Sequence, residues 1–583
     1  MPMLRRRPLI SLCMIVKDEA ANLARCLESV RGVADEIVVV DTGSTDATVE
    51  VAQGYGARIV REPWGGDFAA ARNAGVRVAR GEWILFLDGD EALDAGQGGL
   101  LRQLAELRED EGLFLEIRNY VGDGSHGATV NPVLRMFRNR PEHRFEGRIH
   151  EQIAASILAR TPGASFRLTD VVIHHYGYQQ AFVVEKNKVE RNMKLLEAAL
   201  ADEPDNPFYL YNLGVEYLRT GRPEPALALF RACADRIDPL AVSYAHLASK
   251  YEIRCLQALG RWDEAVRRTD EALPLYPDYT DLHQYRAASM IALGREADAA
   301  NALLEALKRG RAPSPYHTEE GIGTFRTAYM LGELLERIGE VDEALRWYRE
   351  SIRLRSSLTP PLYRSFRLLR IAGREQDIVP WIEDGFLPNS PEAWAKLAAV
   401  LSECRCYGPA IELMRRCGMP AEARLVAEAE EALADGRLDD ARAKLETMGA
   451  VRSDAEATAF AEQLRWLSDG EGPWRDALAA ALAEERRETD GRLADEDWRA
   501  LRRLLEGSAA CGRTDRYGRV LSYWQEALGS VEASAATGAR MLVLGLSETA
   551  DRHLALAFHG ETEDGRRDLI AQARLRLPME QGE

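Results

Sequence analysis

Three apolar segments in the first hundred residues each run directly into acidic residues. Leu9–Val16 is followed by Lys17-Asp18-Glu19, Glu36–Val40 is followed by Asp41, and Trp83–Leu87 is followed by Asp88-Gly89-Asp90. Continuous apolar runs of this length are typical of strands buried on both faces, and the stretches between them repeat apolar residues at helical spacing. This alternation predicts a parallel, doubly wound (Rossmann-like) α/β sheet, whose strands share one edge at their carboxyl ends.

Further elements of this domain follow from the same patterns. We expect helices over Ala20–Val30, from Thr42–Asp46 to about Gly54, and over Phe68–Ala79, with short strands at Arg58–Val60 and Val171–Ile173. Thr42–Asp46 (TGSTD) supplies residues that cap helix N-termini. All the chemistry-bearing strand ends are therefore expected on one rim, which is where open α/β sheets bind ligands.

The stretch LDGDE places carboxylates where burial is costly. An unpaired buried charge is expensive, so Asp88 and Asp90 need a counter-charge. Two carboxylates two residues apart can reach one hard cation, and Mg²⁺ or Mn²⁺ prefers oxygen ligands that it often shares with substrate phosphates. An acidic turn capping the next helix is the alternative for an isolated D-x-D. Asp41 and Glu19 at the same rim favour the divalent cation.

Three strings in this region occur in a familiar order. SLCMIVKDEAANLARCLESV, EIVVVDTGSTDATVEVA and DFAAARNAGVRVARGEWILFLDGDEAL resemble family 2 of the nucleotide-sugar glycosyltransferases, which has the GT-A fold. The resemblance covers roughly the first 180 residues. It implies an inverting, hexosyl-type transfer from a nucleotide diphosphate sugar, by family habit a UDP-sugar, with a divalent metal. Gly89 departs from the usual Ala, and we expect it to loosen the turn without removing a ligand.

The resemblance also implies roles for single residues. It assigns to the nucleotide sugar Glu19, Asp41, Asp67, Arg72 and Asp88. Glu19 and Asp41 are expected at the base and ribose, and Asp67 and Arg72 near the nucleotide and its phosphates. Asp88 also belongs to the metal site with Asp90, which is the firmer ligand.

A basic segment follows, RMFRNRPEHRFEGRIHEQI, with five arginines and two histidines. It suits phosphate or an anionic acceptor, and an exposed loop is the alternative, which we favour for Arg140 and His143. Transfer requires a base for the acceptor proton. The IHE string resembles the family subgroup that carries tetratricopeptide repeats, which implies Glu151 as general base with His150 beside it. The two roles can be exchanged.

The string DVVIHHYGYQQ offers a third metal ligand. A neutral histidine can complete a shell begun by two carboxylates, and the subgroup's HYGY pattern points to His175 rather than His174. A strand-end histidine hydrogen-bonded locally is the alternative. On the next helix, Lys188 and Arg191 can close over the diphosphate or remain exposed helix charges.

From about residue 206 a glycine followed five residues later by an alanine recurs. The pairs are Gly221/Ala226, Gly260/Ala265, Gly294/Ala299, Gly339/Ala344 and Gly436/Ala441. The spacing is 34 residues from Gly260 to Gly294 and from Gly339 to Gly373, with other gaps of 39 and 45. This resembles the tetratricopeptide repeat and implies an all-α solenoid, with loops or extra turns inserted at the longer gaps. A plain helical bundle is the alternative.

We therefore expect three regions: a GT-A catalytic domain at 1–195, a repeat solenoid at 196–450, and a C-terminal helical region at 451–583 that resembles degenerate repeats. Concave repeat surfaces bind extended peptides or proteins, so we expect a peptide or protein acceptor. The implied relatives include cysteine-glycosylating enzymes of bacteriocin pathways, and their subgroup often dimerises through its repeats. The alternatives are synthesis of cell-surface polysaccharide or lipid-linked glycan, and a non-catalytic repeat scaffold with a vestigial transferase domain.

The charge and hydropathy of the chain exclude other partners. A formal net charge of −18 over 583 residues argues against nucleic-acid polymers and membrane surfaces. No apolar run approaches the roughly 18 residues of a membrane span. The basic and apolar start lacks a small-residue cleavage site and runs into Lys17, so we interpret it as the first core strand of a cytoplasmic protein.

Overall fold

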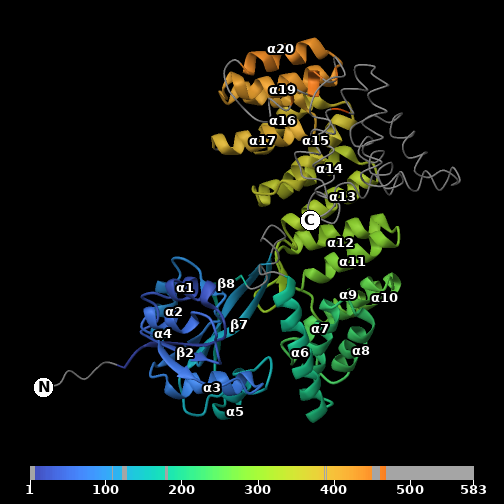
Figure 1. Cartoon of the computed structure of the whole chain (residues 1–583). Helices are drawn as coiled ribbons and strands as arrows, with labels where there is room; N and C mark the ends of the chain where they lie inside the picture. The colour runs from blue at the N-terminus through green and yellow to red at the C-terminus, as the bar shows by residue number, and fades with distance from the viewer. Residues whose placement is uncertain are drawn as a thin grey trace. The chain divides into compact units, whose positions relative to one another are not determined.

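A computed structural model describes residues 7–449 except 108, 121–127, 177–181, 387 and 389, together with 460, 461, 463–465, 467 and 504. The chain divides into two compact units, Met1–Leu334 and Leu335–Glu583. The first unit holds the α/β domain and the early helix pairs, and the second holds the later helices (Figure 1). Nearly all of the expected C-terminal helical region, 451–583, lies outside the described residues.

The sheet of the first unit has a parallel half and a mixed half. The parallel strands lie in the order β3 (Arg58–Arg61), β2 (Glu36–Asp41), β1 (Ile10–Val16) and β4 (Trp83–Phe86). Beyond β4 come β7 (Ala128–Arg138), β6 (Gly112–Tyr120), β8 (Phe166–His175) and β5 (Glu91–Leu93). The contacts β4–β7, β7–β6 and β8–β5 are antiparallel, whereas β6–β8 is parallel. The expected α/β fold is confirmed, but the prediction of a parallel sheet holds for the first half only.

Helices cover both faces of this sheet. Leu12, Met14 and Val39 pack with α1 (Ala20–Ser29), α2 (Thr48–Gly54) and α4 (Gly98–Glu106). The alternate residues Cys13 and Val38 pack on the other face with α3 (Phe68–Val78) and α5 (Ala154–Arg160). Successive side chains of a strand point to opposite faces, so two buried faces require the continuous apolar runs seen in the sequence. Figure 1 shows α3 and α5 on the side of the sheet opposite to α1, α2 and α4.

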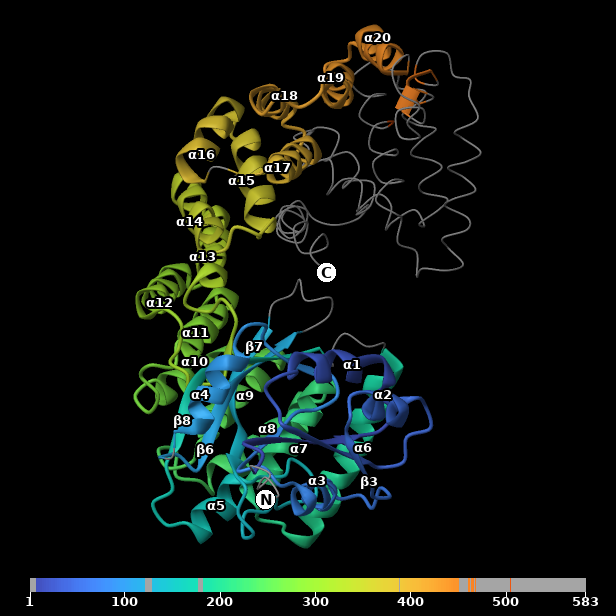
Figure 2. The same cartoon turned by 90° about the vertical axis from the view of Figure 1, so that its left-hand side faces the viewer.

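The remainder of the described chain is almost entirely helical (Figure 2). The helices of the first unit are α6 (Phe182–Asp202), α7 (Pro207–Arg219), α8 (Pro223–Ala234), α9 (Ala245–Ala258), α10 (Trp262–Ala272), α11 (Asp281–Ala292) and α12 (Glu296–Arg309). After α13 (Phe325–Arg337) follow α14 (Val341–Leu354), α15 (Pro360–Ile371), the 3₁₀ turn η2 (Glu375–Asp377), α16 (Ile378–Gly385), α17 (Pro391–Glu403), α18 (Tyr407–Arg416), α19 (Ala421–Ala434) and α20 (Leu438–Gly449). None of the helices in the described ranges is long and apolar enough to cross a membrane.

The recurring glycines and alanines occupy equivalent places in these helix pairs. All five glycines lie between paired helices with φ from 69° to 87°, a region that residues with a Cβ avoid. The residue after each glycine donates its N–H to a carbonyl five residues earlier, as Arg295 does to Met290 at 2.8 Å. This is the Schellman end of the first helix. Each alanine is 0% exposed, where the two helices cross. The prediction of tetratricopeptide-like helix pairs is confirmed.

The 45-residue gap between Gly294 and Gly339 contains an inserted segment after α12. This segment carries β9 (Thr318–Glu319), which pairs antiparallel with β7 through Thr129↔Glu319 and Val130↔Thr318. The repeats thus add a strand to the sheet of the α/β domain. The Arg311 guanidinium also contacts the Glu116 carboxylate of β6 at 2.8 Å. The expected boundary at residue 195 falls inside α6, and the sheet and the first helix pairs form one unit.

Candidate active site

The carboxyl ends of β1 and β2 are held together by local polar contacts. The Thr42 hydroxyl donates to the Val16 carbonyl at 3.1 Å, and the Asp41 carboxylate accepts the Ser44 N–H at 2.9 Å. Beyond β1, Asp18 has φ of 55° and accepts the Thr45 N–H at 2.7 Å. These bonds place the predicted nucleotide residue Asp41, 8% exposed, at the rim beside the end of β1.

The D-x-D turn lies directly against Glu19. A Cβ added to Gly89 would be 3.0 Å from Cγ and 3.1 Å from Cβ of Glu19, closer than most real contacts of a Cβ, so the Glu19 side chain would have to shift. Gly89 therefore admits the Glu19 side chain to the turn. We expected this glycine to loosen the turn, but the structure gives it a steric role. Contact across the rim explains the departure from alanine.

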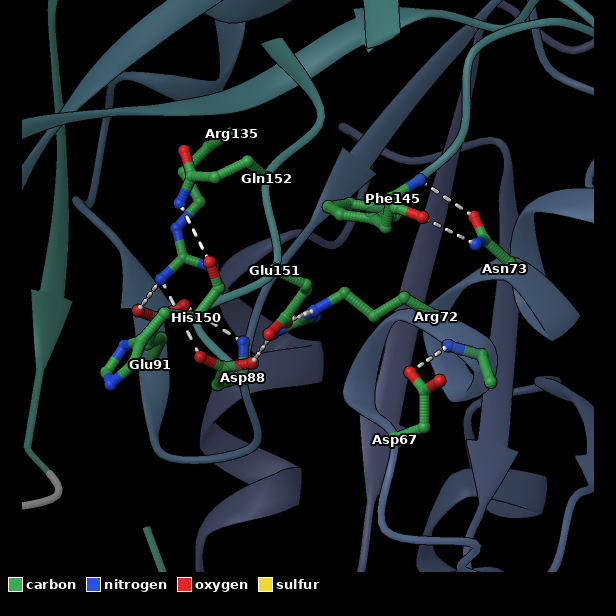
Figure 3. Close-up of polar contacts among 11 residues, drawn as sticks. Asp67, Arg72, Asn73, Asp88, Glu91, Arg135, Phe145, His150, Glu151 and Gln152 are labelled. Carbon is green, nitrogen blue, oxygen red and sulfur yellow. Dashed lines mark hydrogen bonds and ion pairs between the residues drawn. The ribbon is translucent and has the colours of Figure 1, made fainter. Parts of the chain in front are cut away.

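Arg72 connects two predicted site residues that are 63 positions apart in the sequence. The Asp67 carboxylate caps α3 by accepting the Ala70 N–H at 2.8 Å, and Arg72 follows one turn later with 9% of its side chain exposed. Its Nη2 donates to the Asp88 carboxylate at 2.8 Å, and its Nε donates to the Glu151 carboxylate (Figure 3). The guanidinium carbon lies 5.0 Å from the centre of the Phe86 ring. One buried cation thus joins the predicted base to the D-x-D turn.

A second buried arginine serves the same turn. Arg135 of β7 donates from Nη2 to Glu91 at 2.5 Å and lies 3.7 Å from the Asp88 carboxylate. The other oxygen of Glu91 accepts the Asp88 N–H at 2.9 Å, and Glu91 is 1% exposed. Burial raises the pKa of Glu91 to about 7, although the charge of Arg135 opposes that shift. Glu91 therefore holds the backbone of the D-x-D turn at Asp88, and Arg135 in turn holds Glu91.

The counter-charge of Asp88 comes from these arginines. Desolvation raises the pKa of Asp88, but Arg72 and Arg135 outweigh it and hold that pKa well below its usual value. The side chain is still 37% exposed, so it remains open to a ligand. The sequence analysis attributes the compensation of Asp88 and Asp90 to a metal ion, and for Asp90 that role stays a prediction. For Asp88, the structure shows that Arg72 and Arg135 supply compensating charge.

The second aspartate faces β8. The Asp90 carboxylate lies 3.4 Å from Nε2 of His175, whose Nδ1 lies 2.7 Å from the Asn119 side-chain oxygen. Burial lowers the pKa of His175, but Asp90 and the neighbouring carboxylates raise it more, so the net shift is upward. His174 is engaged elsewhere, with Nε2 at 2.9 Å from Asp94 and Nδ1 at 2.8 Å from the Tyr120 hydroxyl. Of the two histidines, His175 is the one beside the D-x-D turn.

Only part of the predicted metal set lies together. Asp90 and His175 are adjacent, whereas Asp88 is directed toward Arg72. Across the described residues, no three His, Cys, Asp or Glu side chains gather closely enough to hold a metal ion. The assignment of Asp88, Asp90 and His175 as metal ligands stays a prediction.

The predicted catalytic pair lies in the loop between β7 and α5. An isolated antiparallel bridge joins Glu146 to Gln152, and within it His150 has φ of 53°. Figure 3 shows Glu151 reaching Arg72 while the His150 ring is turned away. Burial lowers the pKa of His150, and its Nε2 is buried without a hydrogen-bond partner in the described part of the chain. Of the two candidates for the base, Glu151 is therefore the one joined to the D-x-D turn.

Comparison with known proteins agrees with this architecture. The model for Glycosyl transferase family 2 matches residues 11–161, and the model for the Tetratricopeptide repeat matches residues 325–357. The glycosyltransferase SunS of Bacillus subtilis is 30% identical over 289 residues, which cover 49% of this chain and 67% of SunS. The chain belongs to glycosyltransferase family 2. TPR repeat-containing protein Synpcc7942_0270 of Synechococcus elongatus is 35% identical over 282 residues, covering 43% of this glycosyltransferase and 69% of that protein.

Likeness to solved structures is weak. The crystal structure of S. aureus TarS is 15% identical, with a TM-score of 0.27, covering 42% of this glycosyltransferase and 54% of the TarS chain. A likeness of this size places no residue of the site.

Several contacts of the glycosyltransferase site were not predicted. Asn73 exchanges two hydrogen bonds of 2.9 Å with the backbone N–H and carbonyl of Phe145, which attaches α3 to the catalytic loop (Figure 3). Glu91 and Arg135 were visible in the sequence, but their pairing was not. A buried carboxylate next to D-x-D was the available signal, because it requires a cation.

Two expectations about the basic segment fared differently. Arg140 is 45% exposed and pairs with Glu111, as expected for a surface loop. His143 was expected to be exposed but is 0% exposed, with Nδ1 at 2.9 Å from the Arg138 carbonyl. This local contact satisfies its polarity, which makes burial possible. The Arg191 guanidinium lies 5.3 Å from the Phe68 ring centre, and the Lys188 side chain lies outside the described part of the chain.

Proposed function

We propose that this glycosyltransferase transfers a hexose from a UDP-sugar to a peptide or protein acceptor, with inversion at the anomeric carbon and with Mg²⁺ or Mn²⁺. The observation that carries the proposal is Arg72, which contacts both Glu151 and Asp88. An acceptor base and a donor-binding carboxylate are thereby held within the span of one guanidinium group. A single displacement needs this proximity, because the proton leaves the acceptor as the diphosphate leaves the sugar.

The residues at the rim suit a nucleotide diphosphate. Asp41 and Glu19 lie at the strand ends where open α/β sheets bind nucleotides. Arg72 Nη1 and Arg135 Nε are buried without a hydrogen-bond partner among the described residues, so each retains a donor for an anionic oxygen. Positioned cations stabilise the negative charge that develops on the departing diphosphate.

Asp90 and His175 fit a divalent cation in part. Both offer ligand atoms that Mg²⁺ or Mn²⁺ accepts, and the contact of His175 Nδ1 with Asn119 holds the ring with Nε2 toward Asp90. Diphosphate oxygens and water would supply other ligands, with Asp88 available if it leaves Arg72. When bound, the ion would add positive charge at the leaving diphosphate.

Glu151 acts as the general base in this proposal. Its side chain is 10% exposed, and its contact with Arg72 fixes the direction of the carboxylate. It would take the proton of the acceptor nucleophile on the face of the sugar opposite to the diphosphate. His150 would act beside it, through the shape of the loop.

The repeats favour a peptide or protein acceptor because concave helical-repeat surfaces bind extended chains. Transfer to cell-surface polysaccharide or lipid-linked glycan is the rival outcome, and a repeat scaffold without activity is the third. A cytoplasmic location and a homodimer formed through the repeats remain predictions.

The test begins with nucleotide binding and turnover. The chain is incubated with Mn²⁺ and, in turn, UDP-glucose, UDP-galactose, UDP-N-acetylglucosamine and GDP-mannose, and calorimetry measures UDP affinity with and without EDTA. We expect metal-dependent UDP binding and slow release of UDP from one donor. Absence of both leaves only the scaffold. Added peptides should gain the mass of the sugar carried by that donor, whereas gain only on glycan or lipid acceptors would support the rival enzyme.

Two variants test the residue roles. Glu151→Gln should retain UDP binding but lose turnover by about 10²–10⁴-fold. Glu146→Gln is the matched control, because Glu146 is an exposed carboxylate in the same loop. Asp90→Asn should lose the effect of Mn²⁺ on UDP affinity. If Glu151→Gln turns over at the normal rate, the assignment of the base is wrong.

A further inference from the structure

The loop that carries Glu151 is seated on the repeats. Ile149, two residues before Glu151, is 3% exposed. It belongs to a buried apolar cluster whose other members come from α6 and α7: Leu196, Ala199, Tyr209 and Leu213. All of these residues lie in the first compact unit. Helices that the sequence assigns to the repeat architecture therefore pack directly against the catalytic loop. We call this buried contact of Ile149 with α6 and α7 the seat.

The same loop is held from the other side by the start of α3. The Phe68 N–H donates to the Arg148 carbonyl at 2.9 Å, and the Phe68 ring packs against the Ile149 cluster. Gly147 has φ of 95°, and a Cβ there would lie 3.6 Å from the Tyr209 hydroxyl oxygen. Arg72 projects from the same helix one turn after Phe68. The loop is therefore enclosed between α3, which carries Arg72, and the first repeat helices.

The strained backbone conformation in this loop is at His150, between Ile149 and the proposed base Glu151. His150 has φ of 53°, a left-handed conformation that a residue with a Cβ rarely adopts. Such a conformation persists only where the surroundings impose it. On one side Ile149 is buried in the repeats, and on the other Glu151 is bound to Arg72. These two anchors account for the turn at His150.

We propose that α6 and α7 position the general base: the burial of Ile149 against them fixes the turn at His150 and so directs the Glu151 carboxylate to Arg72. The inference rests on the proposed role of Glu151. Ile149 and Leu213 are positioning residues that touch no reacting atom. The strand β9 attaches the repeats to the sheet at a second place, through its pairing with β7. The first repeat pair is thus part of the catalytic unit.

The reasoning predicts a rate effect larger than a binding effect. Of the proposed donor-binding residues, Glu19 and Asp41 follow β1 and β2, away from this seat. Arg72 lies nearer, but α3 and its bond to Asp88 hold it independently of Glu151, so affinity for UDP should depend less on the seat than the rate does. Displacement of a catalytic group by about 1 Å can cost about 10²-fold in rate. Loss of the seat should therefore lower kcat and leave the donor KM nearly unchanged.

The first experiment measures hydrogen exchange in the full chain and needs no substrate. Ile149→Ala should raise exchange in the peptide 146–153, and Leu213→Ala, made from the repeat side, should raise it in the same peptide. The matched control is Ile253→Ala, which removes an isoleucine that is 0% exposed in α9 and belongs to a different cluster. The control should leave exchange of 146–153 unchanged. Equal exchange in all the variants would overturn the proposal.

The second experiment measures release of the nucleoside diphosphate, UDP or GDP, from whichever of the four donor sugars the unaltered chain turns over. We expect Ile149→Ala and Leu213→Ala to lower kcat by about 10- to 100-fold with the donor KM within a factor of about three. Ile149→Val, which keeps a β-branched side chain in the seat, should restore most of the rate. Ile253→Ala should keep the normal kcat. A rate defect in Ile253→Ala equal to that of Ile149→Ala would show general damage and overturn the positioning role.

The two proposals fail differently. If Glu151→Gln abolishes turnover while Ile149→Ala and Leu213→Ala retain normal kcat, the seat is structural and the proposed function stands. If Glu151→Gln is itself normal, the assigned base is wrong and the positioning role fails with it.

Discussion

Lowering the pH should release strand β9 from its anchor in the repeats. The His317 N–H donates to Nε2 of His246 at 3.2 Å, and the Tyr279 hydroxyl donates to the His317 carbonyl at 2.8 Å. These bonds hold the residue that directly precedes Thr318–Glu319. Burial, reinforced by the charge on Lys250, lowers the pKa of His246 to about 4 and that of His317 to about 3. Protonating His246 at Nε2 would replace the acceptor of the His317 N–H with a second donor.

The magnitude follows from linkage. An unfolded histidine has a pKa of about 6.5, so between that value and the folded pKa the opened state binds a proton that the folded state excludes. Stability from a depressed histidine pKa is therefore present above about pH 6.5 and is lost as the pH falls toward the folded pKa. From pH 7 to pH 5 each histidine contributes a loss of about 2 kcal/mol, so His246 and His317 together contribute about 4 kcal/mol.

Native-state hydrogen exchange measures this loss where it occurs. After correction for the intrinsic pH dependence of exchange, the free energy of opening for a peptide over 312–324 should fall by about 4 kcal/mol from pH 7 to pH 5. Peptides from α18 in the second unit provide the internal control. His246→Gln should remove about half of the pH dependence. A fall below about 1 kcal/mol, or an unchanged slope in the variant, would refute the assignment of buried neutral histidines.

Three further predictions concern single side chains. Lys250 is 2% exposed and lies beside the carboxylates of Asp281 and Glu319. Replacing Lys250 with Met should lower the opening free energy of the same peptide by about 3–5 kcal/mol, because these carboxylates lose their cation. Exchange equal to that of the unaltered chain would contradict this. Gly294→Ala, at φ of 69°, should cost about 1–2 kcal/mol by thermal unfolding, whereas Gly99→Ala inside α4 should cost nothing. Gly89→Ala should push against Glu19 and weaken UDP binding in calorimetry, and unchanged affinity would show that the turn yields without cost.

The elements that could be predicted are those whose residue pattern lies within one short segment of the sequence. Strands β1, β2 and β4 are continuous apolar runs, and the helices between them repeat at helical spacing, so their limits were expected to within a few residues. The hairpin β6–β7 was not predicted. Its Cα partners run from Gly112↔Phe137 to Tyr120↔Ala128, so the strands are defined by each other rather than by any local pattern. The mixed half of the sheet is built around that hairpin.

The candidate site divides in the same way. The D-x-D string indicated Asp88 and Asp90, and the resemblance of the IHE string indicated Glu151. The structure places Asp90 beside His175. No local signal indicated that Arg72 would bridge Glu151 and Asp88, or that Arg135 would neutralise Glu91. Many arginines in the sequence were equally eligible partners, and only folding selects which guanidinium faces which carboxylate.

By itself, the sequence determined the strand ends with their carboxylates and the glycine–alanine turns of the repeats. Both are local, because burial on two faces requires an apolar run and a left-handed turn requires glycine. Tertiary structure alone decided that Ile149 packs on Leu213 and that Glu319 pairs with Thr129. These partners lie far apart along the chain, and their contact forms only when the whole of the first unit excludes water.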